Sequence, residues 1–133
     1  MRITRGNSLT MSGKSCALPI GDFRDFDRIF YYSIFPNMLL SLHPDYMMTH
    51  TLWPKAVDRT EVVCEWHFHP SEMAKPGFQA DDAIDFWDQT NREDWGISEL
   101  SQLGVSSRAY TPGPYSKREE LLYAFDRIVS ADE

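Results

Sequence analysis

The sequence predicts an α+β domain in which an antiparallel sheet is followed by two helices. From Arg28 to Pro70 the chain is dense in aromatic and branched apolar residues, and these runs are separated by turn-forming Pro, Asn and Asp. After Pro70 the apolar residues recur at helical intervals instead. Successive short strands with turn-sized gaps form an antiparallel meander, and we expect the helices to cover one face of it.

Four strands are expected in the apolar segment, with the bounds Ile29–Phe35, Met38–Leu42, Tyr46–Trp53 and Glu61–His69. Alternation is clearest in the fourth strand, because its apolar and polar residues have opposite parity. One face carries Val62, Cys64, Trp66 and Phe68, and the other carries Glu61, Glu65, His67 and His69. This strand therefore has one packed face and one polar face.

Two helices are expected after the sheet, over Phe78–Leu103 and Ser116–Val129. Apolar residues recur at helical spacing between acidic residues in the first helix, and Gly104 stands where that helix would end. Ser116 and Glu119 have the spacing of a capping box at the start of the second helix.

Composition restricts the class of protein. A chain of 133 residues holds one domain of ordinary size, and 42% apolar content indicates a folded chain. The net charge of −7 leaves no basic surface for nucleic acid. The longest nearly uncharged run, Ile29–Leu42, is shorter than the about 20 residues that a bilayer helix needs, and no signal peptide is seen. Cys16 and Cys64 are expected to be reduced thiols, so we expect a cytoplasmic protein without membrane contact.

Several groups of polar residues are candidates for chemical sites. His67, His69 and Glu72 resemble a cupin metal set, but Pro70 interrupts the strand and the spacing to Glu72 is short, so two solvent-exposed histidines are the better interpretation. His43 and His50 have no carboxylate or Cys at close spacing and are expected to be structural. No G-x-S-x-G motif supports serine hydrolysis.

Most acidic residues of the first expected helix belong to its solvated face, and Asp94 is the exception. It follows Trp87 by seven residues, about two helical turns, so both lie on one side of the helix together with Asn91. A carboxylate on an apolar side needs a hydrogen bond or a metal. We expect Asp94 to be partly buried and to point toward the concave face of the sheet.

Four segments then resemble one known family. They are Tyr31–Leu42 (YYSIFPNMLLSL), Phe86–Trp95 (FWDQTNREDW), Gln102–Ser107 (QLGVSS), and Tyr110–Ser116 (YTPGPYS) followed by Glu119 and Phe125. In order and spacing they resemble the C-terminal part of the catalytic domain of Rieske non-haem iron oxygenase α subunits, the aromatic-ring-hydroxylating dioxygenase family. The resemblance covers nearly the whole chain from about residue 28.

The resemblance implies a helix-grip fold, related to Bet v 1-like and START-like domains, whose antiparallel sheet wraps a long helix. It also implies a mononuclear Fe(II) held by two His and one carboxylate. The carboxylate belongs to an Asp followed five residues later by Glu and eight later by Gln, here Asp94, Glu99 and Gln102. Asp94 is therefore the metal ligand that the resemblance implies, and no other catalytic or cofactor-binding residue is assigned.

The chain departs from the family pattern at both redox centres. It has no Asp-x-x-His-x-x-x-x-His segment for the iron histidines, and neither Cys lies in the Cys-x-His or Cys-x-x-His context of a 2Fe-2S cluster. We therefore expect residues 1–27 to be an irregular leader, the truncated start of the domain. Residues 28–133 would be the C-terminal portion of the catalytic domain, and the cluster would belong to an N-terminal domain outside it.

The intact family protein would activate O2 at Fe(II) to hydroxylate or demethylate a small organic substrate. Its electrons would come from NAD(P)H through a reductase or ferredoxin, and many members are trimers. The isolated chain is not expected to be competent. Two other interpretations stay open, a non-catalytic helix-grip module that binds a small molecule and a cupin-like metal protein.

Overall fold

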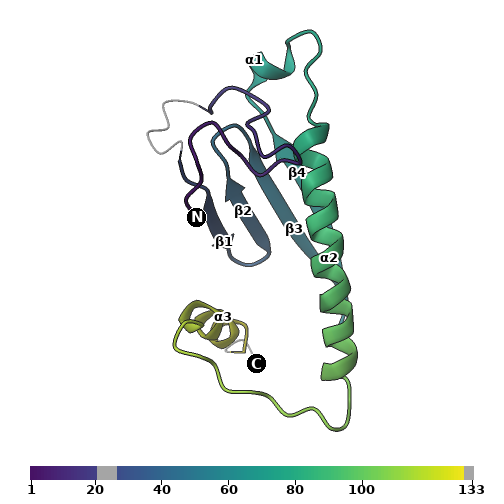
Figure 1. Cartoon of the computed structure of the whole chain (residues 1–133). Coiled ribbons are helices and arrows are strands. Elements are labelled where there is room, and N and C mark those ends of the chain that lie inside the picture. Colours follow the sequence, from purple (N-terminus) through teal and green to yellow (C-terminus); the bar gives the residue numbers. More distant parts are fainter. Residues whose placement is uncertain (21–26, 131–133) are drawn as a thin grey trace. The chain divides into compact units, whose positions relative to one another are not determined.

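Figure 1 shows the computed structural model, which describes residues 1–20 and 27–130. The chain divides into two compact units, Met1–Glu99 and Leu100–Glu133. The first unit contains the sheet and most of the long helix α2 (Asp81–Val105), and the second contains α3 (Glu120–Ser130).

The sheet has four antiparallel strands in sequence order, β1 (Phe30–Ile34), β2 (Met38–Leu42), β3 (Met47–Ala56) and β4 (Arg59–His67). The predicted meander and the α+β class are confirmed. The third strand was predicted to stop at Trp53, but β3 continues to Ala56 with a register irregularity between Pro54 and Ala56. Proline has no N–H to donate, and the strand passes it by a local shift in pairing.

The fourth strand was predicted to reach His69 but ends at His67. The one-turn helix α1 (Pro70–Met73) follows at once, and the Nδ1 atom of His69 accepts a hydrogen bond of 3.2 Å from the backbone N–H of Ser71. His69 is thus the N-cap of α1, a role that proline at the first helical position favours. At four residues, α1 is too short to show a helical period in the sequence.

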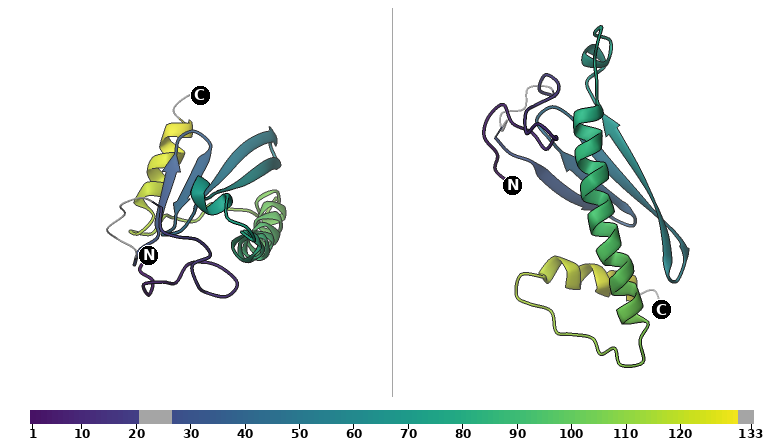
Figure 2. Two further views of the ribbon diagram at one scale, coloured as in Figure 1. Left: turned by 90° about the horizontal axis from the view of Figure 1, so that it is seen from above. Right: turned by 45° about the vertical axis from the view of Figure 1, so that its right-hand side comes forward.

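The register assigns the two faces of the sheet. Met48 pairs with Trp66 and His50 with Cys64, so these four side chains share one face. Figure 2 shows α2 running along this side of the sheet. The opposite face carries Thr49 and Glu65 among others, which confirms the alternation predicted for the fourth strand.

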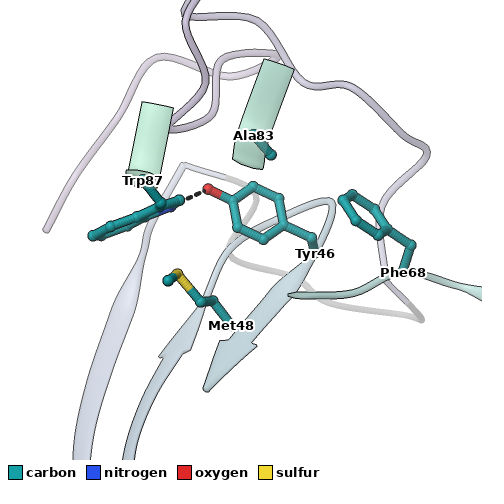
Figure 3. Packing of buried hydrophobic residues seen from close by; sticks show 5 residues of the cluster. All are labelled: Tyr46, Met48, Phe68, Ala83 and Trp87. Carbon is teal, nitrogen blue, oxygen red and sulfur yellow. Dashed lines mark hydrogen bonds between the residues drawn. The ribbon is translucent and has the colours of Figure 1, made fainter. Parts of the chain in front are cut away.

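The core lies where the first half of α2 meets the sheet. Its buried apolar residues are Tyr46, Met48, Phe68, Ala83 and Trp87 (Figure 3). Leu9, Cys16 and Ala17 pack against this cluster from the N-terminal segment. The first twenty residues have no strand beyond two isolated bridges, yet they supply part of the core.

The long helix is buried over only part of its length. Ala83, Trp87 and Asn91 are its buried residues, and from Arg92 to Val105 every residue is exposed except Gln102, which is half-buried. Within the described part of the chain, neither α2 nor any other helix is long and apolar enough to cross a bilayer.

The second unit begins with the predicted cap. The Glu119 carboxylate accepts a hydrogen bond of 2.6 Å from the backbone N–H of Ser116, which lowers the pKa of Glu119. Regular helix then begins at Glu120, four residues later than the sequence predicted. That this helix shares a sheet face with α2 stays a prediction.

Strand β1 is the edge strand nearest the N-terminus and is rich in exposed apolar side chains. Tyr31, Tyr32 and Ile34 are all more than two-fifths exposed, and among the described residues β2 is the strand that pairs with β1. An exposed apolar edge strand is a template for pairing with another chain.

We expect the purified chain to self-associate through β1. Ile34→Lys places a charge on this edge and should shift the chain toward monomer in sedimentation velocity across a concentration series. Val57→Lys, at the fully exposed β3–β4 turn, is the matched control and should leave association unchanged. A wild-type chain that is monomeric at all concentrations would contradict the expectation.

Candidate functional site

Helix α2 meets the sheet along a narrow stripe. Ala83, Trp87 and Asn91 are four residues apart and are its buried positions, so one face of α2 is directed at the sheet. Ala83 is fully buried, whereas Trp87 and Asn91 are 9% and 6% exposed. Because both have polar groups, their hydrogen bonds decide how the helix is held.

A hydrogen-bonded series connects Trp87 with the sheet and the N-terminal segment. The Trp87 indole Nε1–H donates to the Tyr46 hydroxyl at 2.7 Å (Figure 3). The same hydroxyl donates to the Leu9 carbonyl at 2.6 Å. Tyr46 is fully buried, and its burial raises the pKa of the phenol well above the ordinary value. One neutral hydroxyl therefore joins three segments that are distant in sequence.

His43 lies beside this series without a hydrogen bond. Its ring stacks on Tyr46 at 4.1 Å between centroids and meets the Trp87 ring edge-on at 5.7 Å. The residue is 1% exposed, and neither ring nitrogen has a partner in the described part of the chain. Burial lowers the pKa of His43 from 6.5 to about 4, so the imidazole is neutral near pH 7.

Asp45, which lies in the turn between β2 and β3, binds the N-terminal segment. Its carboxylate accepts a hydrogen bond from the Ser8 hydroxyl at 2.5 Å and another from the Cys16 backbone N–H at 2.8 Å. Burial, and after it the neighbouring Asp45 charge, raise the pKa of the Cys16 thiol to about 12. Cys16 is therefore a protonated, unreactive thiol, in line with the sequence expectation of a reduced structural cysteine.

His50 contacts α2 from strand β3, one turn of helix beyond Trp87. Its Nε2 atom lies 3.2 Å from Oδ1 of Asn91, and the Asn91 Nδ2 group donates to the Cys64 sulfur at 3.7 Å. The Trp87 ring lies edge-on to the His50 ring at 6.2 Å. Asn91 thus bridges β3 and β4 and is the last buried residue of α2.

Asp94 follows Asn91 by three residues on the same side of the helix. The expectation that its side chain is partly buried is wrong, because Asp94 is exposed. The helix has no buried residue after Asn91, so no described residue of the sheet covers it. Its backbone carbonyl accepts from the Ser98 hydroxyl at 3.0 Å, and its carboxylate has no ion pair or hydrogen bond within the described part of the chain.

The other predicted candidates are not brought together. His67 and His69 are exposed, as expected, and His69 caps α1. Glu72 is buried and forms an ion pair with Lys75 at 2.6 Å, which lowers the pKa of Glu72. Over residues 1–20 and 27–130, no three His, Cys, Asp or Glu side chains are grouped to hold a metal ion.

Sequence reasoning missed the contact between His50 and Asn91. His50 was judged by its sequence neighbours, where no partner for it is found. Strand parity offers a signal, because His50 and the apolar Met48 are two residues apart and therefore point to the same face of β3.

Comparison with known proteins identifies the family. The family described as "Ring hydroxylating alpha subunit (catalytic domain)" matches residues 2–131. The chain therefore belongs to the catalytic-domain family of the α subunits of Rieske-type ring-hydroxylating oxygenases, which confirms the resemblance seen in the sequence.

Two similar proteins are oxygenase subunits with a named activity. The glycine betaine monooxygenase oxygenase subunit of Pseudomonas aeruginosa is 34% identical over 76 residues, which is 57% of this chain and 18% of that protein. Its counterpart in Chromohalobacter salexigens is 28% identical over 85 residues, 64% of this chain and 19% of that protein. The matched stretch spans less than a fifth of each relative.

The described residues fit one position of the family's iron site and not a whole site. Asp94 is an exposed carboxylate without a partner among them, which suits the anionic ligand of Fe(II). No histidine is grouped with it: His43 is enclosed by aromatic rings and His50 is bonded to Asn91. The two imidazoles that a facial triad needs are therefore not supplied by these residues.

The Tyr46 hydroxyl should be a major contributor to stability. Tyr46→Phe removes the acceptor of the Trp87 N–H and the donor to the Leu9 carbonyl, leaving both polar groups buried. We expect the free energy of unfolding in urea to fall by about 2 kcal/mol. Tyr32→Phe, at an exposed position, is the control, and an equal effect of the two variants would contradict this role.

His43 should make stability depend on pH. Between pH 6.5 and about 4 the unfolded chain binds a proton at His43 that the folded chain does not, so stability falls as the pH is lowered through this range. At 1.36 kcal/mol per pKa unit the loss is about 3 kcal/mol. Urea titrations at a series of pH values give the free energy of unfolding as a function of pH. Its decrease between pH 6.5 and about 4 should be smaller in His43→Phe and unchanged in His67→Gln. Equal slopes in wild type and His43→Phe would refute the assignment.

Proposed function

We propose that this chain forms the C-terminal portion of an oxygenase catalytic domain and that Asp94 is the carboxylate ligand of its mononuclear Fe(II). The observation that carries the proposal is the position of Asp94. It lies one turn beyond the last buried residue of α2, within the segment whose residues resemble the family's iron-binding helix, and it is exposed.

Asp94 would supply the anionic oxygen of a three-ligand site, with two imidazoles from a segment outside the described residues. When bound, the iron supplies the binding and activation of O2, since three ligands on one face leave open positions for dioxygen. The chain's own part is to hold the carboxylate. Its exposure and the absence of an ion pair or hydrogen bond to the carboxylate among the described residues leave both oxygens accessible to a cation.

The proposed reaction is the O2-dependent hydroxylation or demethylation of a small organic substrate, with electrons from NAD(P)H through a reductase and a 2Fe-2S cluster. The relatives are named for glycine betaine, and we propose this compound as the first substrate to test. The chain alone would not be competent, because the described residues contain one ligand of the three.

The test places the 133 residues in the Pseudomonas aeruginosa oxygenase subunit in place of the stretch that they match. Iron beyond that of the 2Fe-2S cluster and product from glycine betaine are measured for the parent, Asp94→Ala and Glu93→Gln. Glu93 is the exposed neighbour and serves as the control. The absorption spectrum of the cluster reports whether the subunit is folded.

We expect Asp94→Ala to lose the mononuclear iron and the product while the cluster spectrum is retained, because the cluster uses other ligands. Glu93→Gln should behave as the parent. Iron and turnover that survive Asp94→Ala would remove Asp94 from the site. Tight Fe(II) binding by the 133-residue chain alone, lost in His67→Ala, would favour the cupin-like interpretation instead.

A further inference from the structure

The contact between Asn91 and His50 is the last point at which α2 is held on the sheet. Beyond it the helix continues for fourteen residues, from Arg92 to Val105, and of these only Gln102 is even half-buried. Within the first unit, the direction of any side chain in the next turn therefore depends on how the helix is fixed at Asn91.

The geometry of this contact fixes the rotation of α2 about its own axis as well as its position along the sheet. The amide of Asn91 is used at both ends, with Oδ1 bound to His50 on β3 at 3.2 Å and Nδ2 directed at Cys64 on β4 at 3.7 Å. His50 and Cys64 are cross-strand partners, so the two anchor points belong to one rigid pair of strands. A slip of the helix by one residue would turn it by about 100° and break both contacts.

We propose that Asn91, held by His50, is the positioning residue of Asp94. The pair sets the rotation of α2 where burial ends, and so sets the direction in which the Asp94 carboxylate leaves the helix three residues later. Trp87 cannot do this alone, because its bond to Tyr46 lies two turns before Asp94. This inference rests on the proposed function of Asp94 as a metal ligand.

The test uses substitutions on β3, which leave α2 itself unchanged. His50→Leu removes the group that faces Oδ1 of Asn91, and His50→Gln keeps an amide N–H donor near the same place. Tyr46→Phe destabilises the same core without touching the Asn91 contact, and it separates lost stability from lost positioning. Asp94→Ala is included to test the ligand itself.

In the oxygenase subunit that carries the 133 residues we expect the dissociation constant for Fe(II) to rise about tenfold or more in His50→Leu, the range found when partners that orient metal ligands are removed. It should stay near the parent value in His50→Gln and in Tyr46→Phe. Wild-type affinity in His50→Leu together with iron loss in Asp94→Ala overturns the positioning role and leaves the proposed function intact. Iron retained in Asp94→Ala overturns both.

Hydrogen exchange on the 133-residue chain gives a readout that needs neither iron nor the rest of the oxygenase subunit. His50→Leu should speed amide exchange over residues 92–98 while residues 83–87 keep their protection, because Trp87 and Tyr46 still hold the first turns. His50→Gln should leave both stretches unchanged. Equal acceleration along the whole helix in His50→Leu would show a general loss of stability and would refute the positioning role.

Discussion

The bond from the Trp87 indole to the Tyr46 hydroxyl is the contact on which the first unit depends. Tyr46 is fully buried immediately before β3, and its hydroxyl both accepts from α2 and donates to the N-terminal segment. A helix, a sheet and an irregular segment thus share one polar group. A buried hydroxyl that lost either partner would leave an unsatisfied group in the core, so the three segments stabilise one another.

His43 and Asp45, two buried polar residues in the turn before β3, are accommodated in the core in different ways. His43 has no hydrogen-bond partner among the described residues and is kept neutral by burial between aromatic rings, whereas the Asp45 carboxylate accepts two hydrogen bonds from the N-terminal segment. A buried carboxylate with donors is tolerated, while a buried imidazolium without a partner is not. The same turn is therefore stable at neutral pH and sensitive to acid through His43.

Local patterns in the sequence predicted the four strands and the two longer helices, whereas the contacts between distant segments could not be predicted. Alternation in Val62 to His67 predicted β4 and its two faces, since parity is a local property. The hydrogen bond of Tyr46 to Leu9 and that of His50 to Asn91 join residues 37 and 41 positions apart, which no local period encodes. For the same reason Asp94 could be assigned to a helix face, but its exposure could not be predicted, because exposure depends on where the covering sheet ends.

The exposure of Asp94 agrees with a ligand that meets its partners from elsewhere. A carboxylate buried against the sheet without a cation would carry a large desolvation penalty, and the described residues offer no cation or donor to offset it. In the proposed site, the end of burial at Asn91 would leave the carboxylate hydrated until the other ligands arrive, and the His50–Asn91 contact would fix its direction. Under this proposal, the contacts that stabilise the chain and the carboxylate that would bind the metal lie on consecutive turns of one helix face.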